Sequence, residues 1–138
     1  MSILYVAASK NLSKWASDVG LTKFIYKIGV AEEKTEEAVA ALNEQGFAGE
    51  SDWKLVKKQA VEAVVDEVTI IGKLAARERL IDPAIYPKIR SGPGIFKVKI
   101  TNVANHMMIS RALAGEDFKV DKVKPTDVAD YFFKNAQD

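Results

Sequence analysis

The chain has 138 residues, of which 48% are hydrophobic and 28% charged, and its 20 basic residues nearly balance 19 acidic ones. This length suits a single domain, expected over residues 1–138, and the composition is that of a globular protein rather than a disordered one. A net charge of +1 excludes binding to nucleic acid through bulk charge, so any such binding needs a local basic patch.

The residue types also limit the metal sites that the chain can build. The absence of cysteine excludes disulfides and thiolate-bound zinc or iron–sulfur centres, and His106, the sole histidine, excludes the usual multi-histidine sites. Only a carboxylate site remains open. The sequence shows no basic leader region and no long apolar segment, which predicts a cytoplasmic protein with no membrane partner.

Two apolar runs near the start predict two strands, over residues 3–8 and 24–30. Residues 11–19 between them have the spacing of a short helix, and strands so connected usually pair antiparallel. In the second run Lys27 and Gly29 share one face of the strand, whereas Tyr26 falls on the other. The reason for a glycine in this strand is not evident from the pattern alone.

The following segments alternate between helix and strand signals. Residues 35–42 predict a helix with acidic residues in its first turn, and residues 53–56 predict a third strand that continues a meander. Apolar residues at three- and four-residue steps predict the longest helix over 59–80.

The last third of the chain begins with a loop rich in proline and glycine, followed by an alternating strand over 95–100. Two helices close the chain, one from Thr101 or Asn102 to Leu113 and one from Pro125. The sequence therefore predicts an α+β fold, with a small, mostly antiparallel sheet of three to four strands flanked by helices.

Two motifs carry a resemblance to a known family. Ile3-Leu4-Tyr5 on the first strand and Tyr26-Lys27-Ile28-Gly29 on the second, followed by a helix, a strand and an acid-bearing helix, resemble the GIY-YIG nuclease superfamily. The second motif is similar to that of the phage-type branch. The resemblance covers about residues 3–100 and leaves 101–138 as a helical C-terminal extension. It implies a GIY-YIG-like fold and metal-dependent phosphodiester hydrolysis.

The resemblance also implies roles for single residues. In the family, a tyrosine of the first motif, sometimes with one of the second, handles the proton of the attacking water, and these positions match Tyr5 and Tyr26. Gly29 matches the second-motif glycine, where a phosphate can approach closely. A glutamate on a later helix holds one divalent cation, which makes Glu67, or alternatively Glu62, the ligand of Mg²⁺ or Mn²⁺.

The sequence departs from the family pattern at two places. The arginine expected on the helix after the second motif is replaced by a segment that contains Glu36 and Glu37, and the acid before the later aromatic run is replaced by Gly94. Loss of such a cation costs on the order of 3 kcal/mol of transition-state stabilisation. The expected activity is therefore that of an endonuclease lacking its arginine, or of a degenerate domain that binds nucleic acid without hydrolysis.

Basic residues supply the candidate contacts to DNA or another nucleic acid. The candidates are Lys27 beside Gly29, the cluster Lys54, Lys57 and Lys58, and in addition Lys97 and Lys99. Exposed lysines on an edge strand also protect against aggregation, and strand tyrosines usually serve the core. The alternative function is therefore a non-catalytic binding or regulatory protein that keeps the fold and binds a protein partner.

Overall fold

The computed structural model describes residues 2–21, 24–32, 34–62, 65–81, 86, 94–113, 115 and 123–137. Within these ranges the chain has the α+β fold that the sequence predicts. In chain order the elements are β1 (Ser2–Ala8), α1 (Lys10–Asp18), β2 (Ile25–Ala31), α2 (Thr35–Gln45), the 3₁₀ turn η1 (Phe47–Gly49), β3 (Lys54–Val61), α3 (Glu67–Ala75), β4 (Arg79–Leu80), β5 (Ile95–Lys97), α4 (Ile100–Leu113) and α5 (Pro125–Gln137).

The sheet contains five strands in the order β3-β1-β2-β5-β4, each antiparallel to its neighbour. Because β3 pairs with β1 and not with β2, the predicted meander is wrong. Helix α2 packs against both β1 and β3, and so carries the chain past β1 to its far side. The short strands β5 and β4 extend the sheet beyond β2, which takes it past the three or four strands expected.

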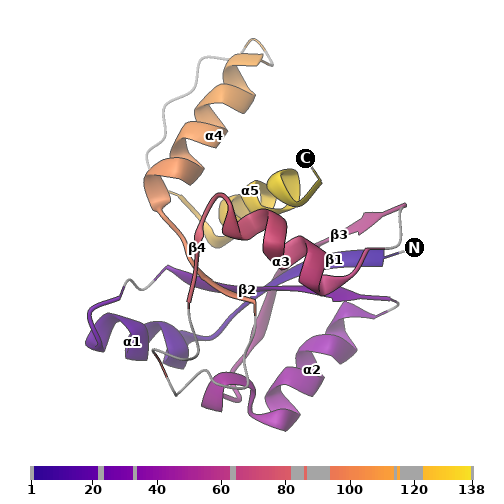
Figure 1. Cartoon of the computed structure of the whole chain (residues 1–138), viewed down its shortest axis with the longest axis vertical. Helices are drawn as coiled ribbons and strands as arrows, with labels where there is room; N and C mark the ends of the chain where they lie inside the picture. Colours follow the sequence, from indigo (N-terminus) through magenta and orange to yellow (C-terminus); the bar gives the residue numbers. More distant parts are fainter. Residues whose placement is uncertain are drawn as a thin grey trace.

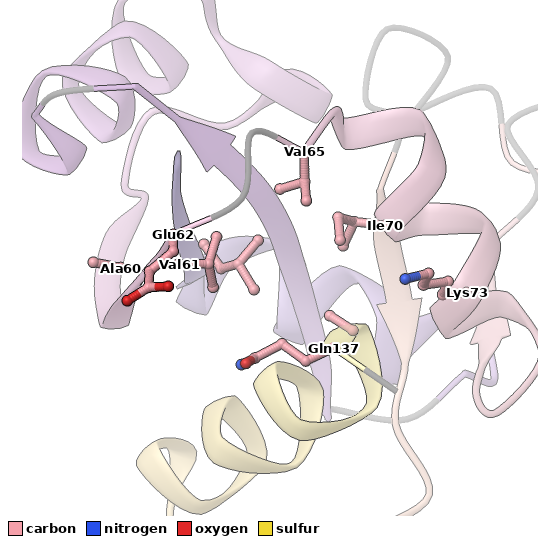
Figure 2. A pocket seen from close by; sticks show the side chains of 9 residues that line it. Ala60, Val61, Glu62, Val65, Ile70, Lys73 and Gln137 are labelled. Atoms are coloured by element: carbon pink, nitrogen blue, oxygen red, sulfur yellow. The ribbon is translucent and has the colours of Figure 1, made fainter. Parts of the chain in front are cut away.

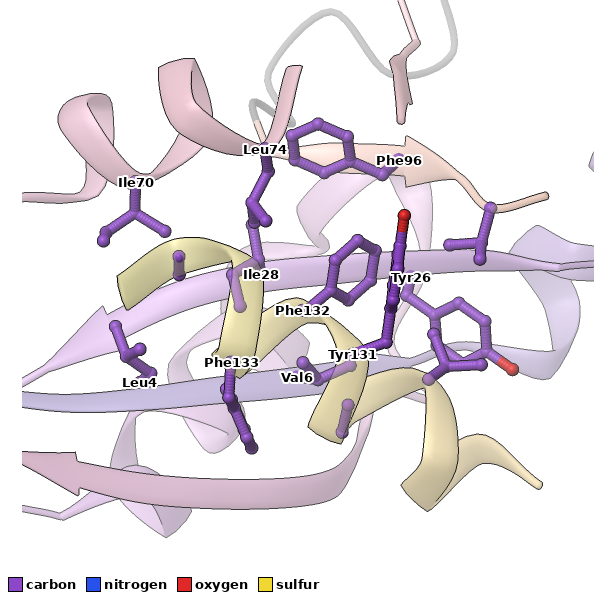
Figure 3. Close-up of a cluster of buried hydrophobic side chains, with 14 of the residues drawn as sticks. Leu4, Val6, Tyr26, Ile28, Ile70, Leu74, Phe96, Tyr131, Phe132 and Phe133 are labelled. Atoms are coloured by element: carbon purple, nitrogen blue, oxygen red, sulfur yellow. The ribbon is translucent and has the colours of Figure 1, made fainter. Parts of the chain in front are cut away.

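Helices cover both faces of the sheet (Figure 1). Helices α1 and α2 bury their apolar side chains on one face, and α3 and α5 bury theirs on the other. Figure 3 shows the second of these cores, in which the ring of Phe132 from α5 lies 5.8 Å from that of Phe96 in β5. Helix α5, which the resemblance leaves outside its core, is thus packed on the sheet.

The long helix predicted over residues 59–80 is wrong. Residues 59–61 continue β3, where they pair with the first residues of β1. The helix begins only at Glu67, after the carboxylate of Asp66 accepts a hydrogen bond from the N–H of Thr69 at 2.7 Å. Valine recurs at helical spacing through this segment but favours strands by its β-branching, so the spacing alone did not separate β3 from α3.

Helix α4 extends away from the rest of the molecule in Figure 1. Val103 is its one fully buried residue. None of the helices in the described ranges is long and apolar enough to cross a membrane.

The register of β1 and β2 explains the glycine in the second strand. Tyr5 is directly opposite Gly29, and its ring lies across the glycine. A Cβ atom at Gly29 would lie 2.3 Å from Cζ and 2.4 Å from Oη of Tyr5, closer than side-chain atoms approach one another. The backbone of Gly29 is outside the left-handed region. Glycine is therefore required for space and not for conformation, and the aromatic ring covers the bare backbone.

Gly29→Ala is expected to destabilise the protein by about 1–3 kcal/mol, because the added methyl group overpacks a buried site and displaces the Tyr5 ring. Urea denaturation followed by circular dichroism measures the change in the free energy of unfolding. In a Tyr5→Leu background the penalty should shrink, since the ring that blocks the methyl group is gone.

Gly72→Ala provides the matched control in α3. A Cβ atom there meets nothing within 4 Å, so the same substitution is expected to stabilise the protein by about 0.5–1 kcal/mol through helix propensity. Equal effects of the two substitutions would contradict the role of the Tyr5 ring.

Candidate functional site

The two tyrosines predicted to be catalytic lie on opposite faces of the sheet. Tyr5 is buried in the core under α1 and α2, whereas Tyr26 is buried in the core under α3 and α5. Tyr26 stands three positions before Gly29, the partner of Tyr5, and side chains an odd number of positions apart point to opposite faces. The structure therefore does not bring the two hydroxyl groups together.

Lys27 and Glu67 meet at the edge of β2, next to the start of β5. The last backbone bond from β2 to the β5 segment runs from the N–H of Ile28 to the carbonyl of Gly94, at 3.0 Å. Lys27 Nζ then donates to the carbonyl of Ile28 at 2.8 Å and to Glu67 Oε1 at 3.2 Å. The same Oε1 accepts from the N–H of Val30 at 3.3 Å. This Lys27–Glu67 bridge satisfies two backbone groups of β2 that no strand in the described ranges pairs with.

The two residues of the bridge differ in how deeply their side chains are buried. The Lys27 side chain is 2% exposed and the Glu67 side chain 36%. Burial lowers the pKa of Lys27, and the charge and hydrogen bond of Glu67 oppose that shift. The ammonium also lies 5.2 Å from the centre of the Phe47 ring, whose face attracts cations. The charged form of Lys27 therefore depends on Glu67 as its counter-ion.

Gly94 makes room for the bridge. Its φ is +83°, and a Cβ atom there would lie 3.0 Å from the carbonyl oxygen of Ile28 and 3.1 Å from Lys27 Nζ. Glycine is therefore favoured both by backbone conformation and by space at the position where the family pattern has an acid.

Tyr5 also belongs to this site through electrostatics. Burial raises the pKa of the Tyr5 hydroxyl to about 12, and the negative charge of Glu67 adds to the shift. A general base works best when its pKa lies near the operating pH. At neutral pH Tyr5 is a protonated phenol that packs on Gly29, and it is poorly suited to accept a proton from water.

The donor set around Glu67 does not fit the divalent cation that the resemblance implies. One carboxylate oxygen is already bound by the Lys27 ammonium, whose charge would repel Mg²⁺ or Mn²⁺. In the described part of the chain, no group of three His, Cys, Asp or Glu side chains gathers at any point. Hard divalent cations prefer several oxygen ligands, so the arrangement favours a structural ion pair.

Glu62, the alternative metal ligand, lies elsewhere. It is exposed just after β3, at a cavity of about 500 Å³ lined also by Ile70 and Lys73 of α3 and by the end of α5. Figure 2 shows Glu62 and Lys73 on opposite sides of this cavity. Leu4, whose side chain faces the α3 and α5 core, lines the same cavity. Glu62 is thus not part of the site that holds Tyr5.

The three lysines of β3 are exposed on the outermost strand, but acids neutralise two of them. Lys57 Nζ lies 2.6 Å from Asp130 Oδ1, and Lys58 Nζ lies 3.0 Å from Glu36 Oε1. Surface pairs of this kind contribute little stability but remove local positive potential. Together with Lys54, these lysines form a surface of mixed charge rather than a basic patch.

A different group of cations comes together at the opposite edge of the sheet. The pairing of β4 with β5 sets Arg79 directly opposite Lys97, and Arg77 and Lys99 flank them. The sequence predicted Lys97 and Lys99 as candidate contacts, whereas Arg79 was not among the candidates. Both segments place cations two positions apart, which is a usable signal, but only the pairing of β4 with β5 shows that the segments meet.

Comparisons of the chain with models of protein families, with curated proteins and with solved structures each give no match. The resemblance to the GIY-YIG superfamily therefore rests on the two motifs and the order of the elements.

Glu67→Gln is expected to destabilise the protein more than Lys27→Met does. Loss of the carboxylate leaves a buried ammonium without a counter-ion, at a cost of about 2 kcal/mol, below the 3–5 kcal/mol of a fully buried pair because Glu67 is partly hydrated. Loss of the ammonium frees a carboxylate that water can reach and leaves the Ile28 carbonyl without its donor, at a cost of about 1 kcal/mol. Urea denaturation of both variants at neutral pH measures the asymmetry.

The penalty of Glu67→Gln should also depend on pH. Because the pKa of Lys27 is lower in the folded protein than the ordinary 10.5, the unfolded chain binds the proton more tightly, and stability rises with pH up to that ordinary value. Without Glu67 the pKa falls further, so the penalty is expected to be full at about pH 7 and smaller at about pH 9.5. An equal penalty at both pH values would contradict this account of Lys27.

Proposed function

We propose that this protein is a GIY-YIG-like domain that binds nucleic acid without cleaving it. The observation that carries the proposal is the Lys27–Glu67 bridge. Glu67 matches the metal ligand of the family, but one of its carboxylate oxygens accepts hydrogen bonds from the buried Lys27 and from the N–H of Val30. Its function in this chain is to complete the edge of β2.

Two further features support the absence of hydrolysis. The raised pKa of Tyr5 disfavours its use as a base, and Tyr26 is buried on the other face of the sheet. Glu36, in the segment where the family has its arginine, forms an ion pair with Lys58 and would repel a phosphate. The proposal accordingly needs no Mg²⁺ or Mn²⁺.

The nucleic-acid part of the proposal rests on the resemblance and on the local gathering of cations at the β4–β5 edge. The chain as a whole is almost neutral, so a partner of high negative charge has to be held at such a patch. Binding of this kind weakens steeply with salt, since counterions released from the phosphates are taken up again.

The competing function, a regulatory protein with a protein partner, has an observation of its own. Met108, Ile109 and Leu113 on the protruding α4 are exposed, Leu113 to 85%. A protein partner would bind such residues through apolar contact, with little dependence on salt. The salt dependence of binding therefore separates the two functions.

A nicking assay tests the absence of hydrolysis. Supercoiled plasmid and a labelled oligonucleotide are incubated with the protein and Mg²⁺, Mn²⁺ or chelator, and no cleavage above the buffer control is expected in any condition. Binding to short DNA, measured by anisotropy, is expected to persist in chelator and to weaken about tenfold or more between about 50 and 200 mM salt.

Glu67→Gln and Glu62→Gln serve as the variants for this assay. Both are expected to bind DNA as the wild type does, because neither carboxylate takes part in the proposed binding. Metal-dependent cleavage that Glu67→Gln abolishes would overturn the proposal in favour of an active nuclease, and a wild type that does not bind DNA would overturn its nucleic-acid part.

A further inference from the structure

A hollow of about 580 Å³ lies at the β4–β5 edge of the sheet. The turn that joins α3 to β4, the start of β4, the end of β5 and the first turn of α4 all line it. Four cations line it, namely Arg77, Arg79, Lys97 and Lys99, and we call it the basic hollow. Its volume falls within the range of ordinary ligand sites, about 300–1,000 Å³.

The acid among the described residues that line the basic hollow is Glu78, and neutral donors already satisfy it. Its side chain is buried, at 5% exposure. Oε2 accepts from the N–H of Lys99 at 3.0 Å, and Oε1 accepts from Asn102 Nδ2 at 3.0 Å and from Tyr131 Oη at 2.9 Å. Glu78 thus fastens the start of α4 to α5 beneath the hollow.

None of the ion pairs found among the described residues involves these four cations. The ion pairs of Lys27, Lys34, Lys57 and Lys58 lie elsewhere in the described part of the chain. Arg77, Arg79 and Lys99 are exposed and Lys97 is half-buried. The described residues that line the hollow therefore carry four positive charges and one carboxylate, in a chain whose net charge is only +1.

Two of these cations are cross-strand neighbours on paired strands. Arg79 and Lys97 are direct partners in the β4–β5 pair, so their side chains leave the same face from neighbouring backbone positions. Like charges placed directly opposite destabilise a sheet. An anion bound between them would remove this repulsion.

We propose that the basic hollow binds the phosphate groups of a nucleic-acid strand. Arginine presents two parallel donors that match phosphate oxygens, and the hollow supplies two arginines with two lysines as additional point charges. The first turn of α4, at the positive end of its helix dipole, also lines the hollow. The lysines of β3, at the other edge of the sheet, are instead largely neutralised by acids.

This inference rests on the proposed function, since it names the surface through which the non-hydrolytic domain holds its partner. It differs from the site that the resemblance implies. The basic hollow uses none of Tyr5, Tyr26, Gly29 or Glu67, and lies on strands that follow α3 in the chain.

The test compares two double variants that remove the same charge from opposite edges of the sheet. Arg79→Gln/Lys97→Gln removes two of the four positive charges of the basic hollow, and Lys57→Gln/Lys58→Gln removes two positive charges of β3. Fluorescence anisotropy with a labelled single strand and a duplex of about 12 nucleotides measures Kd over a salt series.

The hollow variant is expected to bind at least about tenfold more weakly at about 0.1 M salt, and the slope of log K against log salt should fall by about 1.5–2. The β3 variant should lose less than about threefold in affinity, as expected for charges that acids already balance. Equal losses in the two variants, or an unchanged Kd in the hollow variant, would overturn the inference while leaving the proposed function intact. No strand binding by the wild type would overturn both.

A charge-preserving swap and thermal melting separate binding from folding. Arg79→Lys/Lys97→Arg should keep affinity within about threefold, because both charges remain. The melting temperature of Arg79→Gln/Lys97→Gln should be unchanged or higher than that of the wild type, since a repulsive pair is removed. A lower melting temperature together with loss of binding in the swap would contradict a direct phosphate contact.

Inorganic phosphate distinguishes a strand from a free phosphate ligand. At millimolar concentration it is expected to displace the strand only weakly, as it offers one phosphate where the strand offers several. If phosphate alone stabilises the wild type, and not the hollow variant, against heat while strands do not bind, the hollow serves a free phosphate compound and the inference of a strand is overturned.

Discussion

Strand β2 extends beyond its pairing with β5, and the rest of the structure depends on how the backbone groups at this edge are hydrogen-bonded. Among the described residues, no strand pairs with the carbonyl of Ile28 or the N–H of Val30, and unpaired backbone groups of this kind are costly when they are sheltered from water. The Lys27–Glu67 bridge binds both groups with one ion pair. In doing so it fixes the first turn of α3 to the central strand, and it requires a glycine at position 94 where the lysine passes.

This use of Lys27 and Glu67 competes with catalysis. A nuclease needs a carboxylate free for a metal and a base whose pKa suits proton transfer, whereas here the carboxylate balances a buried ammonium and the tyrosine beside it is held protonated. The motifs that resemble the GIY-YIG superfamily are thus compatible with the proposed domain that binds nucleic acid without hydrolysing it. We therefore place the proposed binding at the basic hollow, because a fold by itself does not define an activity.

Local signals in the sequence were sufficient for much of the fold. The alternation correctly placed Phe96 and Val98 in the core, although the strand predicted over 95–100 ends at Lys97 and α4 begins at Ile100. The prediction for the region after Trp53 was wrong, because its valines suit a strand and a helix equally. Only the pairing with β1 extends β3 to Val61.

The site was harder to predict because it depends on register. Tyr5 and Gly29 are each unremarkable in the sequence, and their contact follows only once β1 and β2 are aligned. The same alignment separates Tyr26 from Tyr5. The bridge joins residues 40 positions apart, through a helix whose start the sequence pattern misplaced. Long-range pairing of this kind produces no periodic pattern in the sequence from which it could be predicted.

Amide hydrogen exchange at Val30 tests the central claim most directly, with the amide of Ile28, which is bonded to Gly94, as an internal reference. If Glu67 completes the edge of β2, the Val30 amide is protected in the wild type, and Glu67→Ala accelerates its exchange at least about tenfold more than that of Ile28. A Val30 amide that exchanges freely in the wild type, or that is indifferent to Glu67→Ala, would contradict the structural role of the bridge and return Glu67 to the candidates for catalysis.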